Sequence, residues 1–109
     1  MLGVEGIRKA QEKFGKKPLT GEQVRWGLEN LEISEARIKE LKFDGVIKPI
    51  KLSCDDHEGT SAARVETWDG KEWKVSSDWY EGDKSVTAPL VKEVSAKYAE
   101  EKKITPSCE

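Results

Sequence analysis

The residue types that could do chemistry gather in one short block, SCDDHEG, at residues 53–59. The block places a thiol, three carboxylates and the single histidine of the chain next to one another: Cys54, Asp55, Asp56, His57 and Glu58. A zinc site needs side chains that converge on one point, whereas consecutive residues of an extended segment point alternately to opposite faces. We therefore expect no metal site here, although a second thiol, Cys108, is available from the end of the chain.

Catalysis is also not expected from this block. No other histidine or serine arrangement stands beside His57 from which a catalytic triad could be assembled. The sequence thus predicts no enzyme, no catalytic residue and no cofactor.

Length and charge narrow the classes of partner. A chain of 109 residues is about one domain with one modest core. Its 19 basic and 21 acidic residues nearly cancel and form no sustained basic stripe, so nucleic acid is not an expected partner. No apolar run approaches the roughly 20 residues that cross a bilayer, and none of the first residues forms a signal peptide. We expect a soluble chain whose export would require a leader that this sequence lacks.

Three helices are predicted in the first part of the chain. The first ends at Gly15 and carries apolar residues every three or four positions: Val4, Ile7, Ala10 and Phe14. The second begins with Thr20 as N-cap and Gln23 three residues later, a capping box. Its predicted buried stripe is Val24, Leu28 and Leu31. Ser34 is expected to cap a short third helix that buries Ile38 and Leu41, and VIKPIKLS, residues 46–53, is predicted to be extended.

A β-hairpin is predicted in the middle of the chain, where ARVETW and EWKVSSDW flank Asp69 and Gly70. We favour a three-residue loop with a glycine bulge, which places Val65, Thr67, Trp73 and Val75 on one face together with Ala63. On this register Trp73 belongs to the core and Trp68 faces outward.

A last helix is predicted to open near Thr87 with Pro89 in its first turn. Its expected buried residues are Leu90, Val91, Val94 and Tyr98. The predicted order is therefore three N-terminal helices, a β-hairpin region and a C-terminal helix, a mixture of α and β structure.

Four blocks of the sequence resemble a known family. They are GIRKAQEKFGKKPLTGEQVRWGLENL, SCDDHEG, VETWDGKEWKVSSDW and PLVKEVSAKYAEEKKITPSC. In this order and spacing they resemble the C-terminal part of the extracytoplasmic substrate-binding proteins of ABC transporters, of the branched-chain amino acid (Leu/Ile/Val) type. The resemblance implies the type I periplasmic-binding-protein fold, which is α/β in the whole protein and α+β in a fragment. Residues 1–109 would then be a single C-terminal fragment of a two-lobe protein.

The resemblance also implies a function. Family members capture a small amino acid or related carboxylate between two lobes and deliver it to the membrane permease of an ABC transporter, so a periplasmic or extracytoplasmic location is expected. Asp56 and His57 would lie near the crossing between the lobes, where they contact the ligand or, as we favour, fix the hinge by hydrogen bonds. Because the family is exported to an oxidising compartment, a disulfide between Cys54 and Cys108 is expected.

Alternatives from other classes stay open. One is a free-standing α+β module for protein interaction, and another is a carbohydrate-binding surface formed by the rings of Trp68, Trp79 and Tyr80. As a fragment the chain would lack the second wall of a ligand cleft and would leave strand edges unpaired. We therefore expect it to bind no amino acid by itself and to associate with a second copy or another chain.

Overall fold

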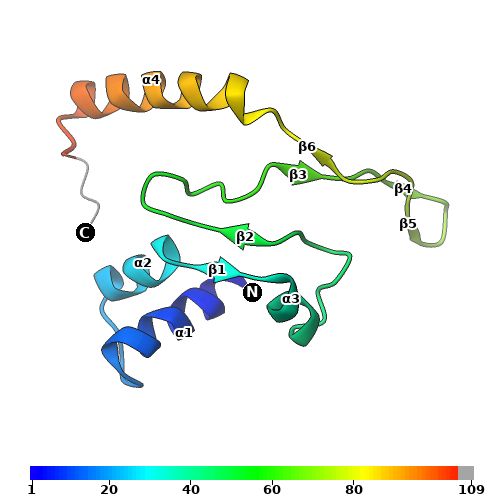
Figure 1. The fold of residues 1–109 in the computed structure, drawn as a ribbon, viewed down its shortest axis with the longest axis horizontal. Coiled ribbons are helices and arrows are strands. Elements are labelled where there is room, and N and C mark those ends of the chain that lie inside the picture. The colour runs from blue at the N-terminus through cyan, green and yellow to red at the C-terminus, as the bar shows by residue number, and fades with distance from the viewer. Residues whose placement is uncertain (106–109) are drawn as a thin grey trace. The chain divides into compact units, whose positions relative to one another are not determined.

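The computed structural model describes residues 1–105, which contain four helices and six short strands (Figure 1). They divide into two compact units, Met1–Thr60 (the N-terminal unit) and the residues from Ser61 onward (the C-terminal unit). Both units mix helices with antiparallel strands, so the α+β class is confirmed. The finer assignment to the type I periplasmic-binding-protein fold stays a prediction. Within residues 1–105, no helix has both the length and the apolar character needed to span a bilayer.

Helices α1 (Leu2–Phe14) and α2 (Gly21–Glu29) pack against each other in the N-terminal unit. Small residues make the contact: Gly27 is buried, and a Cβ there would overlap the carbonyl oxygen of Gly6 and lie 2.8 Å from the Cβ of Ala10. The face of α1 that is buried is therefore formed by Glu5, Gly6 and Ala10. Val4 and Ile7, which the apolar spacing singled out, are exposed instead.

The predicted helix ends of this unit are confirmed. Gly15 ends α1 with a positive φ of 90°. The capping box of α2 is complete, because the Thr20 hydroxyl accepts from the Gln23 amide and the Gln23 side chain accepts from the Thr20 amide. Ser34 caps α3 (Glu35–Glu40) by accepting a hydrogen bond from the amide of Arg37. Each cap satisfies an amide that the helix cannot pair internally.

The core of the N-terminal unit lies around a two-stranded antiparallel ladder. Strand β1 (Glu32–Ile33) pairs with β2 (Ile50–Lys51). The extended segment predicted at residues 46–53 is therefore confirmed in part, because Val46 and Ile47 belong to a turn in which their amides donate to the Phe43 carbonyl. The Leu52 amide extends the ladder by donating to the Leu31 carbonyl. The core consists of Leu31, Ile33 and Ile38, with Ile47 and Leu52 packed against it.

The C-terminal unit opens with a long hairpin made of two paired segments. Strand β3 (Ala62–Ala63) pairs with β6 (Tyr80–Glu81), and β4 (Glu66–Trp68) pairs with β5 (Trp73–Val75). Between the two ladders, residues 64–65 lie opposite residues 76–79, so the second arm bulges. The Val65 amide there donates to the Ser77 hydroxyl at 2.8 Å, which replaces a ladder bond.

The predicted register of this hairpin is wrong. Trp68 lies opposite Trp73, which leaves a four-residue loop of Asp69, Gly70, Lys71 and Glu72 instead of a three-residue loop. The two tryptophans thus share a face, and Trp73 is not a core residue, since 66% of it is exposed. The Asp69 carboxylate fixes the longer loop by accepting from the amides of Lys71 and Glu72. The expectation that Gly70 has positive φ is confirmed at 98°.

Helix α4 (Lys84–Lys102) ends the described chain and corrects two further expectations. It begins at the N-cap Asp83, earlier than predicted, so Pro89 lies inside the helix and not in its first turn. None of its residues is buried, including the four that were predicted to face a core: Leu90, Val91, Val94 and Tyr98. The sequence correctly predicted a helix here, but within the C-terminal unit none of the apolar residues of α4 is covered.

Candidate functional site

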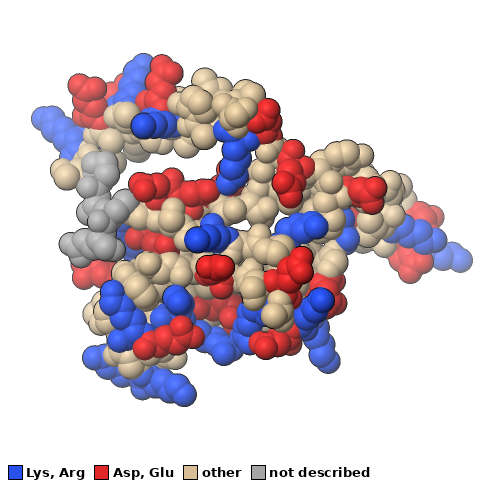
Figure 2. Space-filling model, viewed as in Figure 1, with Lys and Arg blue, Asp and Glu red and all other residues tan. Residues whose placement is uncertain are grey.

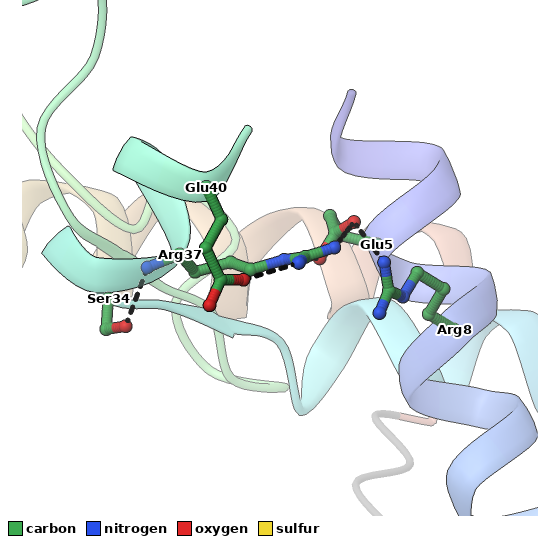
Figure 3. Close-up of polar contacts among 5 residues, drawn as sticks. All are labelled: Glu5, Arg8, Ser34, Arg37 and Glu40. Atoms are coloured by element: carbon green, nitrogen blue, oxygen red, sulfur yellow. Dashed lines mark hydrogen bonds and ion pairs between the residues drawn. The ribbon is translucent and has the colours of Figure 1, made fainter. Parts of the chain in front are cut away.

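The most organised group of charges is the Arg37 cluster, which consists of Glu5, Arg8, Ser34, Arg37 and Glu40 (Figure 3). The guanidinium of Arg37 donates to both carboxylate oxygens of Glu5, from Nε at 2.8 Å and from Nη2 at 2.9 Å. Its Nη1 donates to Glu40 at 2.7 Å, within α3. Arg8 adds a longer contact of 3.7 Å to Glu5 from the next turn of α1.

Helix geometry brings these residues together. Glu5 stands on the buried face of α1, beside Gly6, and only 8% of it is exposed. Ser34 caps α3 by accepting from the amide of Arg37. This cap fixes where the helix that carries Arg37 begins. The hydrogen bonds from Arg37 lower the pKa of Glu5 although burial acts in the opposite direction. The same bonds raise the pKa of Arg37.

The arrangement of the Arg37 cluster is that of an ion-pair network that links two helices. The bidentate pair uses both oxygens of Glu5, and Glu40 takes a third donor of the guanidinium. Two carboxylates and two guanidinium groups balance in charge, so the cluster has no surplus with which to attract an anion. The cluster links α3 to α1 through two residues, Glu5 and Arg37, that lie 32 positions apart in the sequence.

The loop at residues 53–59 folds on itself. The Asp56 carboxylate accepts from the amides of Glu58 and Gly59, both at 3.0 Å. The Ser53 hydroxyl accepts from the Asp56 amide. These are the bonds of a carboxylate that shapes a turn, and they favour the structural role for Asp56 over contact with a ligand.

His57 lies close to α2. Its Nε2 lies 3.5 Å from Oε1 of Glu29, an oxygen that also accepts from Nε of Arg25 at 2.7 Å. His57 itself is exposed. The two predicted site residues thus have different polar partners, and their contact with a ligand stays a prediction. In residues 1–105, no three His, Cys, Asp or Glu side chains are grouped so that they could hold a metal ion.

Two other sequence predictions can be placed only in part. Cys108 lies outside the described residues, so the disulfide between Cys54 and Cys108 stays a prediction. Of the three rings of the carbohydrate alternative, Trp79 is half-buried and carries the Arg64 guanidinium 5.1 Å from its ring centroid. The ring that pairs with Trp68 is Trp73, at 5.6 Å between centroids and 53° between planes. The three rings expected to bind sugar therefore have different surroundings.

The Arg37 cluster was missed by sequence reasoning. Glu5 and Arg37 are ordinary helical residues whose pairing depends on how α1 and α3 meet, and neither falls in a motif. The glycine at position 6 marks the close approach of Leu28 in α2 and gave no signal for α3.

Comparison with known proteins gives one informative match. No protein-family model matches the chain, and none of the curated proteins is significantly similar to it. A solved structure is similar to it with 49% sequence identity and a TM-score of 0.90 over 97% of this chain. That structure is described as the crystal structure of an ABC transporter permease from the Pseudomonas fluorescens group. The chain spans 26% of that protein's length.

This match corrects the family inferred from the four sequence blocks. It supports a link to ABC transporters but contradicts the substrate-binding class, because the similar structure is described as a permease. The expected function, capture of a small amino acid between two lobes, is contradicted with it, as are the substrate-binding and periplasmic descriptions. The physical reason lies in what the blocks encode. Their recognisable features are a capping box, a helix stop and turn residues, which specify local folding and occur in many classes of protein.

Proposed function

We propose that this chain is part of an ABC transporter component of the permease kind, in which it serves assembly and not catalysis. The observation that carries the proposal is the 49% identity, with a TM-score of 0.90, to a protein described as an ABC transporter permease. Since the chain corresponds to about a quarter of that protein, the activity of a whole transporter is not attributed to these residues alone.

The geometry of the N-terminal unit supports a scaffolding role. The charged groups of the Arg37 cluster are committed to one another, and the Asp56 carboxylate accepts hydrogen bonds from backbone amides. Such groups stabilise a fixed shape and leave little capacity for a reacting molecule.

The hairpin of the C-terminal unit supplies a surface suited to contact with another polypeptide. Trp68, Trp73 and Val75 share one face and are each more than half exposed. Paired aromatic side chains at a surface are typical of protein interfaces, where they contribute a large apolar area at a low entropy cost. We define these three residues as the hairpin face.

Co-purification tests the proposal. The chain, carrying an affinity tag and expressed in its native host, is isolated from detergent-solubilised membranes, and the ATP-hydrolysing subunit of an ABC transporter is quantified in the eluate. We expect that subunit to be enriched with the wild-type chain. Its absence from the eluate, with the tagged chain recovered intact, would overturn the proposal.

A matched pair of variants locates the contact. Trp73→Ala removes an exposed ring from the hairpin face, whereas Lys71→Ala truncates a long exposed side chain in the adjoining loop. We expect only Trp73→Ala to reduce co-purification. Equal retention by both variants would show that the transporter contacts a different surface.

A further inference from the structure

Helix α4 carries an exposed apolar face in its first half, which we call the α4 face: Val86, Leu90, Val91 and Val94. Each of these side chains is at least 58% exposed. At 3.6 residues per turn they span an arc of about 140° around the helix, and no charged residue from Lys84 to Val94 falls within that arc. Charged residues enter this side of α4 from Lys97 onward. In the view of Figure 2, the first half of α4 accordingly shows mainly uncharged atoms.

The sequence of α4 does not favour a helix that stands alone in water. Pro89 lies inside the helix, beyond its first turn, so the carbonyl of Ser85 has no amide four residues later to accept from. The three valines of the α4 face are β-branched and lose side-chain freedom in a helix. Since most of the stability of a helix in a protein comes from tertiary packing, a helix of 19 residues with no buried residue requires a surface that covers it.

The exposed area of the chain gives the size of the missing surface. The chain exposes 8629 Å². A folded monomer of 12.3 kDa exposes about 6,100 Å², and two separate units of half that mass expose about 7,400 Å² together. Even against the second figure the excess is on the order of 1,000 Å², which is more than the roughly 800 Å² that each partner contributes to a standard protein interface.

The width of the α4 face indicates what kind of surface covers it. A seam between two paired helices is a narrow stripe, whereas a helix that packs on the core of a globular protein has an apolar arc of roughly 100° or more. The arc of about 140° is of the second kind. The α4 face therefore fits a folded polypeptide with a core of its own better than it fits a single helix.

The structural match contains a polypeptide of that size. It covers 97% of this chain with a TM-score of 0.90, which is too large a share to leave out α4. The similar protein thus has the same helix in the same fold. Only 26% of that protein is matched, so nearly three quarters of its polypeptide lies outside the matched part.

We propose that the α4 face packs against a folded polypeptide of the kind that forms the unmatched three quarters of the similar protein. Leu90 and the three valines then complete a core that this chain does not bury by itself. The inference rests on the same structural match as the proposed function, but it does not depend on transport, because helix packing is independent of what the whole protein does.

A chimera tests the proposal. The matched quarter of the similar protein is replaced by the 109 residues of this chain, and amide hydrogen exchange of α4 is compared between the chimera and the chain alone. We expect the amides of α4 to exchange about 100-fold more slowly or less in the chimera, because opening of the helix there requires loss of tertiary packing. The unmodified similar protein, produced in the same way, is the control for folding.

Two variants of the chimera locate the contact. Leu90 lies within the α4 face, whereas Lys92 lies about 160° away, on the opposite side of the helix. Alanine favours the helix at both positions. We expect Leu90→Ala to speed exchange of α4 by about tenfold or more, because it leaves a cavity in the shared core. Lys92→Ala should leave the exchange unchanged.

Three results would overturn the proposal. One is equal exchange of α4 in the chimera and in the chain alone, with α1 and α2 protected in both. Another is a chimera that does not fold beside a folded control, since this chain would then not fit that polypeptide. The third is an equal effect of Leu90→Ala and Lys92→Ala. None of them depends on co-purification with an ATP-hydrolysing subunit, so the proposed function can fail while this inference holds.

Discussion

At the scale of single residues, Glu5 and Arg37 are charged residues of types that are usually exposed, but here they form an ion pair that stabilises the fold. Arg37→Met keeps most of the hydrocarbon of the side chain but leaves the Glu5 carboxylate, which is 8% exposed, without its bidentate donor. Loss of one partner of a buried pair is strongly destabilising. We expect thermal unfolding to begin roughly 5 °C lower or more, measured by circular dichroism.

Arg8→Met is the matched control for this experiment. Arg8 lies 3.7 Å from the same carboxylate, but more than half of its side chain is exposed, so its removal should have little effect. The double variant Glu5→Gln with Arg37→Met removes the buried charge as well and should recover part of the loss. Equal effects of Arg37→Met and Arg8→Met would contradict a structural role for the pair.

The same pair predicts a dependence of stability on pH. The hydrogen bond from Arg37 holds the pKa of Glu5 below its ordinary value of 4.5 in the folded chain. The resulting stabilisation is present above that ordinary value and is lost as the pH falls through the lower, folded pKa. In urea unfolding between pH 7 and about pH 3, the wild type should therefore lose more stability than Glu5→Gln. Because the carboxylates of Asp69 and Asp83 also have lowered pKa values, only the difference between the two proteins reports on Glu5.

At the scale of elements, the close crossing of α1 and α2 depends on Gly27. A methyl group there would overlap the Gly6 carbonyl oxygen, so the helices must move apart. We expect Gly27→Ala to destabilise the N-terminal unit by about 1–3 kcal/mol in urea unfolding. Gly21→Ala is the control, because a Cβ at that helical position meets no atom within 4 Å and alanine favours the helix. A neutral Gly27→Ala would mean that the helices are not in this contact.

The hairpin loop gives a second prediction for an element. Gly70 has a φ of 98°, which strains a side chain, so Gly70→Ala should destabilise the loop by about 1 kcal/mol or more. Asp69→Ala should disturb the loop too, because its carboxylate accepts hydrogen bonds from two amides and lies 2.6 Å from Nζ of Lys74. The exciton signal of the Trp68–Trp73 pair in circular dichroism reports the change.

Lys71→Ala serves as the control for the loop, since it keeps the backbone amide that Asp69 accepts from. An exciton signal unchanged by both Gly70→Ala and Asp69→Ala would show that the tryptophan pair does not depend on this loop.

The features predicted correctly from sequence are those determined by interactions between residues no more than four positions apart. The capping box of Thr20 and Gln23, the stop at Gly15 and the cap at Ser34 each satisfy local backbone groups. The hairpin register was wrong because Trp68 and Trp73 can both occupy an exposed face, so burial did not select between registers. The ion pair between Glu5 and Arg37 could not be predicted, because it depends on how α1 and α3 are placed in the folded chain.

At the scale of the whole molecule, the family assignment failed for a related reason. The blocks that suggested a substrate-binding protein are rich in helix caps, turns and amphipathic spacing, which many functions share. Asp56 shapes a turn and His57 lies near Glu29, as the favoured structural role predicts, and their contact with a ligand stays a prediction. The sequence patterns of these blocks therefore predicted local structure correctly, but they carried no information about the class of transporter component.

The two units also differ in how their apolar residues are covered, and this difference predicts their dynamics. The N-terminal unit buries Leu31, Ile33 and Ile38, whereas no apolar residue described in the C-terminal unit is buried. Because opening of a helix is opposed mainly by tertiary packing, amides of α4 should exchange with solvent much faster than those of α1 and α2 in dilute chain. Hydrogen exchange followed by mass spectrometry measures this contrast. Protection of α4 equal to that of α1 and α2 in dilute chain would contradict this expectation, because it would show that the apolar residues of α4 are covered in solution.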